Sequence, residues 1–240
     1  MQLTRSEAVF SKVFGHEEID STNLELARQN LADLPEFSAV IAASQTLGKG
    51  RLGRSWQSPA RHSLSLSVLI RPVSEQERQW LTLIAALAVS EALSDLGINA
   101  GIKWPNDILV QGKKLCGILA SAEQGAVIMG IGVNIKNHPE LIDSAVALDA
   151  LGVDTTIDDL AAPIGQQFKL LVSEFRDDPQ AVRAKFVSAC ITLGQQVRAE
   201  FPDGKTSFGL ASEINPSGQL VILTPGRLAL SAADVWHLRN

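Results

Sequence analysis

Hydrophobic and polar positions follow two clear periods in the first half of the chain. Residues 63–70, Ser-Leu-Ser-Leu-Ser-Val-Leu-Ile, alternate with period two, which predicts a half-buried strand of an antiparallel sheet. Between Ser74 and Gly97 the apolar residues recur at helical spacing, and Ser74 with Glu77 forms a capping box. This segment therefore predicts a long helix that covers one face of the sheet.

Shorter segments predict a second helix and the remaining strands of this sheet. Thr22 and Glu25 form a second capping box, which predicts a helix that begins near Asp20. Gln111 and Gly112 are typical of a tight turn between two strands. The remaining strands are predicted at residues 8–14, 39–43, 100–102, 109–110, 113–119 and 125–135.

The C-terminal part of the chain has a different texture. Helices are predicted over residues 156–175 and 179–193, and Pro163 must kink the first of them or delay its start. Turn signals then separate short strands predicted at 197–201, 207–214, 220–223, 227–230 and 235–238. Short strands in such close succession predict a small barrel.

Composition narrows the classes of function. The 21 Lys and Arg residues against 26 Asp and Glu residues give a net charge of -5, which argues against a protein that depends on non-specific DNA contacts. No apolar run approaches the roughly 18 residues of a membrane span. Cys116 and Cys190, the only cysteines, lie in apolar surroundings and are interpreted as reduced core thiols of a cytoplasmic protein. Metal-ligand spacing is absent from the sequence.

The most informative stretch is the loop from Gly48 to Trp56, Gly-Lys-Gly-Arg-Leu-Gly-Arg-Ser-Trp. Its glycines let backbone N–H groups approach a ligand closely, and its three cations suit phosphate or carboxylate. We interpret it as a mobile cationic loop between two strands, with a phosphate chain as its simplest ligand. The plainer alternative is a solvated basic turn without a ligand.

Two common phosphate motifs match this loop only as strings of letters. Residues 48–53 fit the glycine pattern of dinucleotide-binding folds, and residues 48–55 fit a P-loop in which Arg54 replaces the lysine. Both motifs require a helix to begin at the loop, whereas a strand-like segment follows here. We therefore reject both readings.

Three further polar groups are candidates for the same site. Lys103 precedes Pro105, which must bend the strand there, and Asn134 ends a glycine-rich strand. Residues 21–23, Ser-Thr-Asn, would present three polar side chains at a helix N-terminus. Taken singly, each has a plainer reading as a surface cation, a turn residue or an N-cap. Together with the loop they indicate phosphoryl or nucleotidyl chemistry, which needs positioning and charge stabilisation.

With these residues and motifs the chain resembles the biotin protein ligases. The resemblance covers about residues 20 to 135 and is carried by residues 21–23, Gln45, 48–56, 103–107, 114–119 and 130–134, in the family's order. It implies an α+β fold: a mixed, largely antiparallel sheet flanked by helices, of the class II synthetase-like or SH2-like type, over residues 1–193. A small SH3-like β-barrel would follow over residues 194–240.

The resemblance also implies a reaction and a site. Biotin would react with ATP, accompanied by Mg²⁺, to give biotinyl-5′-adenylate, and a lysine of the biotin carboxyl carrier domain of acetyl-CoA carboxylase would then receive the biotin. Lys103 and Arg51 are the implied catalytic residues. The implied biotin-binding residues are Ser21, Thr22, Asn23, Gln45, Gly48, Lys49, Arg51, Lys103 and Gly117. The implied ATP- and adenylate-binding residues are Lys49, Arg51, Arg54, Trp56, Asn106 and Asn134.

Two features of the sequence depart from the family pattern, and two other functions are alternatives to a biotin ligase. Lys49 stands where the family usually has Arg. The stretch before Asp20 is too short for the DNA-binding domain that some members carry, so we expect a ligase without nucleic-acid partners. We also expect no membrane partner, and either a monomer or a homodimer. A lipoate or octanoyl ligase with the same core is the alternative function. An RNA-binding module is disfavoured by the acidic balance and the scarcity of aromatic residues.

Overall fold

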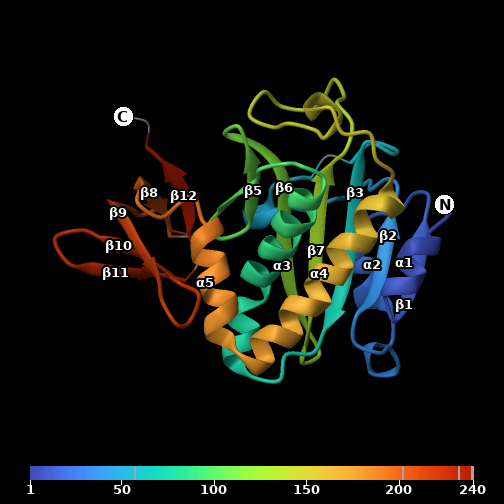
Figure 1. Ribbon diagram of the computed structural model, residues 1–240, viewed down its shortest axis with the longest axis horizontal. Helices are drawn as coiled ribbons and strands as arrows, with labels where there is room; N and C mark the ends of the chain where they lie inside the picture. The colour runs from blue at the N-terminus through green and yellow to red at the C-terminus, as the bar shows by residue number, and fades with distance from the viewer. Residues whose placement is uncertain (57, 202, 232, 239–240) are drawn as a thin grey trace.

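Two β-sheets make up the framework of the protein, as seen in a computed structural model that describes residues 1–56, 58–201, 203–231 and 233–238 (Figure 1). The larger sheet has seven strands in the order β1-β2-β3-β7-β6-β5-β4. All its neighbours pair antiparallel except β1 and β2, so the predicted mixed, largely antiparallel sheet is confirmed. Its strands are β1 Lys12–His16, β2 Ser38–Ala42, β3 Ser63–Ile70, β4 Gly101–Lys103, β5 Asp107–Val110, β6 Lys113–Glu123 and β7 Ala126–Asn134.

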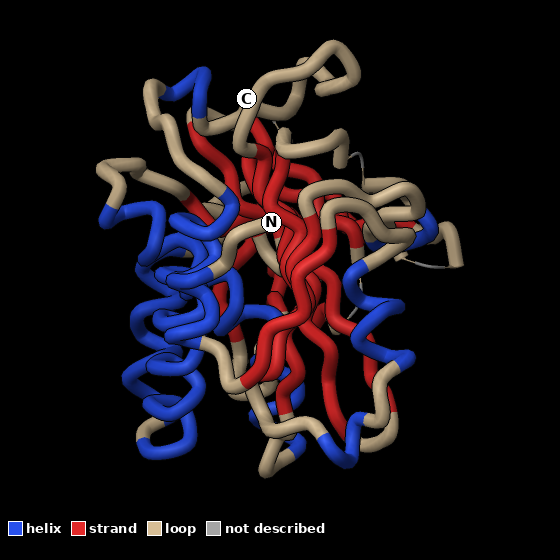
Figure 2. Tube along the Cα trace, turned by 90° about the vertical axis from the view of Figure 1, so that its right-hand side faces the viewer, coloured by secondary structure: helices blue, strands red, loops and turns tan. Residues whose placement is uncertain are grey.

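Helices flank this sheet unequally. Figure 2 shows the long helices on one side of the sheet and a short helix with loops on the other. The helices are α1 Thr4–Val9, α2 Thr22–Arg28, α3 Glu75–Asp95, α4 Ile157–Asp177 and α5 Pro179–Ala189. The long helix predicted from Ser74 is confirmed: Ser74 accepts a hydrogen bond from the Glu77 N–H, and Gly97 has a positive φ of 77° beyond the end of α3.

The period-two pattern of β3 sorts its residues onto two faces of the sheet. Leu64, Leu66 and Val68 join the main core with residues of α3 and α4. The serines point to the other face, where Ser65 and Ser67 pair in register with Gly132 and Gly130 of β7. The prediction of a half-buried strand is wrong, because all eight residues of β3 are buried. The serine face is covered by α2 and by the chain around residue 58, and it forms part of the candidate site.

The N-terminal predictions need three corrections. Residues 8–14 are not one strand, because α1 ends at Val9 and β1 begins at Lys12. The N-cap of α2 is Ser21 rather than Thr22, and no side chain completes the expected capping box. Gln45, distant in the sequence, accepts the N–H of Thr22 instead. Local capping signals cannot foresee such a tertiary partner.

Three predictions about later elements also have definite outcomes. Pro163 does not delay α4, which runs from Ile157 to Asp177 with the proline inside it. The turn at Gln111 and Gly112 is confirmed, since both residues have positive φ, 51° and 76°. Asp203 and Gly204 likewise lie in the turn between β8 and β9, with Gly204 at φ 81°.

The second sheet contains the predicted C-terminal strands. They are β8 Gln196–Glu200, β9 Thr206–Ile214, β10 Leu220–Leu223, β11 Arg227–Leu230 and β12 Asp234–His237. They pair antiparallel in the order β11-β10-β9-β8-β12, and among the described residues no pairing joins the two edge strands into a closed barrel. One face of this sheet packs into the main core, and Trp104 Nε1 donates to Gly218 O at 3.0 Å. The domain boundary at 193/194 remains a prediction.

Two further observations concern the described part of the chain. Within it, no helix is long and apolar enough to cross a membrane. Cys116 and Cys190 are free and buried, as predicted, and burial raises the pKa of both thiols.

Candidate functional site

A cavity of about 650 Å³ lies on the face of the large sheet that α2 covers. It is bounded by the start of α2, the loop after β2, the β4–β5 turn, β6, β7 and β12. All predicted site residues except Gly48 line it: Ser21, Thr22, Asn23, Gln45, Lys49, Arg51, Arg54, Trp56, Lys103, Asn106, Gly117 and Asn134. Gly48 is buried in the loop, where its carbonyl accepts the N–H of Trp56 at 2.9 Å.

The floor of the cavity is made of glycines on neighbouring strands. Gly117 of β6 and Gly132 of β7 are paired in register, and Gly130 lies two residues along the same face. A β-carbon on Gly130 would lie 2.4 Å from Asn23 Oδ1, and one on Gly132 would lie 2.5 Å from Trp56 Cε2. Side chains therefore cannot be added here without displacing the side chain of Asn23 or of Trp56. The glycines therefore let the side chains of Asn23 and Trp56 pack directly on the strands at the floor of the cavity.

The polar end of the cavity is a hydrogen-bonded cluster at the start of α2. Gln45 Oε1 accepts the backbone N–H of Thr22 at 2.7 Å and its hydroxyl at 3.1 Å. Ser67 Oγ lies 2.7 Å from Thr22 Oγ1 and 2.5 Å from Asn23 Oδ1. Ser21 is buried, and its hydroxyl does not cap the helix. This arrangement fixes the directions of several donors and acceptors before any ligand arrives.

The cationic loop folds back on itself above this floor. The Gly50 N–H donates to Arg54 O at 2.6 Å, and Lys49 and Ser55 form an antiparallel bridge. A single 3₁₀ turn spans Arg51–Gly53, and the next helix along the chain is α3. The loop lies between β2 and β3 and starts no helix, so the rejection of both string motifs is confirmed. Lys49 is exposed on the loop.

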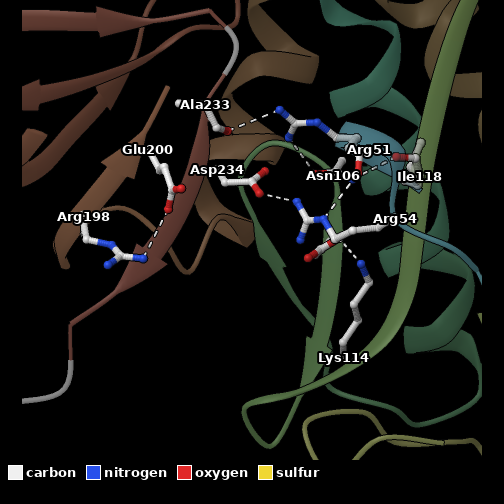
Figure 3. A network of polar contacts seen from close by, with 10 residues as sticks. Arg51, Arg54, Asn106, Lys114, Ile118, Arg198, Glu200, Ala233 and Asp234 are labelled. Carbon is white, nitrogen blue, oxygen red and sulfur yellow. Dashed lines mark hydrogen bonds and ion pairs between the residues drawn. The ribbon is translucent and has the colours of Figure 1, made fainter. Parts of the chain in front are cut away.

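Two arginines of this loop point to the C-terminal sheet (Figure 3). Arg51 donates to Asn106 Oδ1 at 3.0 Å and to Ala233 O at 3.3 Å. Arg54 forms an ion pair with Asp234, the first residue of β12. Burial lowers the pKa of Arg51, and the charges of Asp234 and Asp107 oppose that effect. The guanidinium groups are therefore held at the cavity by partners from two separate parts of the chain.

Lys103 faces a second charged pair at the β4–β5 turn. It is the cross-strand partner of Asp107, whose Oδ1 lies 2.6 Å from Lys114 Nζ. Lys103 Nζ lies 5.3 Å from the centroid of the Trp236 ring. Burial lowers the pKa of Lys103, and the charge of Asp107 opposes that shift. A half-buried ammonium beside an open cavity is suited to stabilising negative charge on a bound group.

The two predicted asparagines line the cavity and are also held in place by hydrogen bonds within the protein. Asn106 Nδ2 donates to Ile118 O at 2.9 Å, while its oxygen accepts from Arg51. Asn134 Nδ2 donates to Val146 O at 3.1 Å and its side chain is almost fully buried. Both residues thus fix neighbouring segments in place around the cavity.

The cavity is also lined by residues that the sequence did not assign to the site, among them Asp107, Lys114, Asp234 and Trp236. Asp107 and Lys114 lie inside conspicuous motifs, so their charges could have been assigned to the site. Asp234 and Trp236 carry no local signal, because they reach the cavity from β12, about 180 positions after the loop. Among the described residues, no group of three or more His, Cys, Asp or Glu side chains is arranged to hold a metal ion.

Comparison with known proteins decides the family. The model of the biotin/lipoate A/B protein ligase family matches residues 15–136. The biotin--[acetyl-CoA-carboxylase] ligase of Mycobacterium tuberculosis is 37% identical over 230 residues, which cover 91% of this chain and 86% of that protein. The chain belongs to the biotin protein ligase family. It is accordingly a ligase.

Solved structures of biotin protein ligases share the fold. The Aquifex aeolicus enzyme in complex with biotin and ATP superposes with a TM-score of 0.83 at 28% identity, covering 96% of this chain and all of that one. The Leishmania major enzyme in complex with biotinyl-5-AMP gives a TM-score of 0.68 at 27% identity, covering 92% of this chain and 99% of that one. Relatives named as biotin ligases do not favour the lipoate or octanoyl alternative.

Proposed function

We propose that this ligase attaches biotin to a lysine of a biotin carboxyl carrier domain in two ATP-dependent steps. The observation that carries the proposal is the cavity itself, in which a polar cluster, a glycine floor and a set of fixed cations meet. The polar cluster suits the ureido group of biotin, the floor suits its apolar rings, and the cations suit a carboxylate and phosphates.

In the first step, a carboxylate oxygen of biotin attacks the α-phosphorus of Mg-ATP. The bond from that phosphorus to the bridging oxygen breaks, and pyrophosphate leaves with its electron pair. Lys103 and Arg51 stabilise the charge that develops on the phosphate and carboxylate oxygens. Mg²⁺ enters with the nucleotide as part of the substrate. Arg54 and Lys49 of the loop contact the adenylate, and Asn134 lies near the adenine.

In the second step, the ε-amine of the carrier lysine attacks the acyl carbon of biotinyl-5′-adenylate. An amide bond forms, the bond from the acyl carbon to the phosphate oxygen breaks, and AMP and a proton are released. The loop from Gly48 to Trp56 covers the mixed anhydride before this transfer, which limits its hydrolysis by water. Trp56 acts as the packing part of this lid.

Mass spectrometry of a carrier domain after incubation with enzyme, ATP and Mg²⁺ tests the proposal. With biotin, we expect a mass gain of one biotinyl group on a single lysine. With lipoate in place of biotin, we expect no gain. A carrier that stays unmodified with biotin, or that is modified equally well by lipoate, would refute the proposed substrate.

A further inference from the structure

The exposed face of the C-terminal sheet carries an unusual group of apolar side chains. Phe208, Trp236, Leu223 and Leu238 are 57%, 44%, 41% and 40% exposed. Exposed Trp and Phe are common anchors of protein interfaces, whereas scattered single apolar residues need no explanation. We call these four residues the aromatic face.

Strand register places these residues on one side of the sheet. Arg198 of β8 pairs with Trp236 of β12 on one flank and with Phe208 of β9 on the other. Residues directly opposite each other in a sheet share a face. Leu223 of β10 pairs with Leu210, which lies two positions from Phe208 on β9 and so shares its face. Leu238 lies two positions beyond Trp236, and its N–H donates to Gln196 O at 2.9 Å, so it continues the same row.

The opposite side of the sheet is buried against the main core. Val197, Ala199 and Val235, which alternate with the exposed residues, are buried in the main core. The guanidinium of Arg198 lies 5.7 Å from the centroid of the Trp236 ring, and Arg198 pairs with Glu200 at 3.3 Å on the same strand (Figure 3). The charge of Arg198 on the aromatic face is therefore balanced by Glu200, and covering this face would bury apolar area without leaving that cation unpaired.

Trp236 joins this face to the catalytic cavity. Its ring lines the cavity and lies beside Lys103 Nζ, while 44% of its surface is exposed. A lysine side chain spans only about 6 Å from Cα to Nζ, given five bonds of ordinary length. Any polypeptide that delivers a lysine to the reacting carbonyl must therefore lie against the rim of the cavity. The exposed row that begins at Trp236 extends from that rim.

We infer that the aromatic face is the docking surface for the carrier domain whose lysine is biotinylated. This inference rests on the proposed transfer to a carrier lysine. Trp236 contacts the carrier close to its lysine, and Phe208 with Leu223 contacts it farther from the reaction. A second copy of this chain is a poorer occupant, because lasting cover over Trp236 would obstruct the entry of the lysine.

Substitution of Phe208 tests the inference, because it lies outside the cavity. Phe208→Ala is compared with Leu170→Ala, whose side chain on α4 is equally exposed at 57%. At saturating biotin and ATP, we expect Phe208→Ala to raise KM for the carrier about tenfold, the scale of losing one interface anchor, and Phe208→Glu to raise it further. Leu170→Ala should leave this KM unchanged, and pyrophosphate release without carrier should be normal in all three variants.

Hydroxylamine separates docking from chemistry, because this small nucleophile attacks the mixed anhydride to give biotinyl hydroxamate and AMP without a docking surface. We expect equal hydroxamate formation by the wild-type protein and the Phe208 variants. Unchanged carrier KM in both Phe208 variants would overturn the inference, and so would a parallel loss with hydroxylamine. A change in sedimentation with unchanged carrier KM would assign the face to self-association instead. Absence of hydroxamate with the wild-type protein would refute the proposed function itself.

Discussion

The indole of Trp56 lies directly against the backbone of Gly132. A β-carbon placed on Gly132 would come within 2.5 Å of Trp56 Cε2, closer than real contacts allow. Trp56 belongs to the cationic loop and Gly132 to the central strand β7, so this contact fixes how closely the loop approaches the cavity floor.

Substitution of that glycine should therefore impair the site more than the fold. We expect Gly132→Ala to displace Trp56, at a cost of about 1–3 kcal/mol typical of overpacking, and to lower the rate of adenylate formation by about tenfold or more. Gly226→Ala is the matched control, since its β-carbon would meet nothing within 4 Å. Pyrophosphate release with biotin and ATP measures the effect. Normal release by Gly132→Ala would show that the contact is dispensable.

Lys103 is expected to act on the transition state of adenylation. Its ammonium lies at the cavity, 5.3 Å from the centroid of the Trp236 ring, so loss of the charge removes an electrostatic donor from the site. Lys103→Ala should slow pyrophosphate release without carrier by about 10² or more. Lys205→Ala, which removes an 82% exposed lysine side chain, provides the comparison. Near-normal release by Lys103→Ala would remove this residue from the catalytic set.

The same lysine should reduce the stability of the fold at neutral pH. Burial lowers its folded pKa below the ordinary 10.5, so burying the charged form costs free energy at every pH below the folded pKa. That cost declines as pH rises from the folded pKa toward 10.5, because the folded state then binds fewer protons than the unfolded state. We expect Lys103→Met to raise the free energy of unfolding at pH 7 while slowing adenylation as strongly as Lys103→Ala does.

Urea unfolding of the wild-type and Lys103→Met proteins at a series of pH values measures this effect. The gain in stability should be largest near neutral pH and should shrink at high pH. A difference that stays constant with pH, or a variant less stable than the wild type at pH 7, would contradict the assigned cause.

Local periodicity explains why much of the fold can be predicted. The alternation in β3 and the helical spacing in α3 each repeat over enough residues to identify the element, and Gly97 marks the helix end. Residues 8–14 are too few to show a period, so the end of α1 and the start of β1 merge into one apolar segment. Burial of the β3 serines depends on α2 and the chain near residue 58, which no pattern within the strand can reveal.

The residues of the candidate site also fall into two groups, those that the sequence can predict and those that it cannot. Lys103 and Arg51 lie in segments of unusual composition, so the residues themselves indicate a site there, whereas Gln45 is assigned to the site only by the resemblance to biotin protein ligases. Asp234 cannot be nominated, because its role depends on a contact with Arg54 across 180 positions of sequence. Its surroundings in the sequence are those of an ordinary short strand. Tertiary partners of this kind become visible only once the two sheets are packed together.

The ion pair between Arg54 and Asp234 should help retain the adenylate. Asp234→Asn removes the charge that orients Arg54, and we expect biotinyl-adenylate to dissociate several-fold faster while its formation changes little. Escaped adenylate would appear as biotin on lysines of bystander proteins. Asp203→Asn, which disrupts an exposed pair with Lys205, is the control. Unchanged dissociation from Asp234→Asn would mean that the C-terminal sheet does not hold the loop over the cavity.

The cavity is expected to make a biotinyl-adenylate and to keep it bound before any carrier arrives. Native mass spectrometry of the enzyme with biotin and Mg-ATP, without carrier, tests it most directly. The predicted result is one biotinyl-5′-adenylate bound per chain and one equivalent of pyrophosphate released, followed by loss of the bound adenylate when carrier is added. Enzyme that carries only intact ATP and biotin, with no pyrophosphate released, would contradict the account.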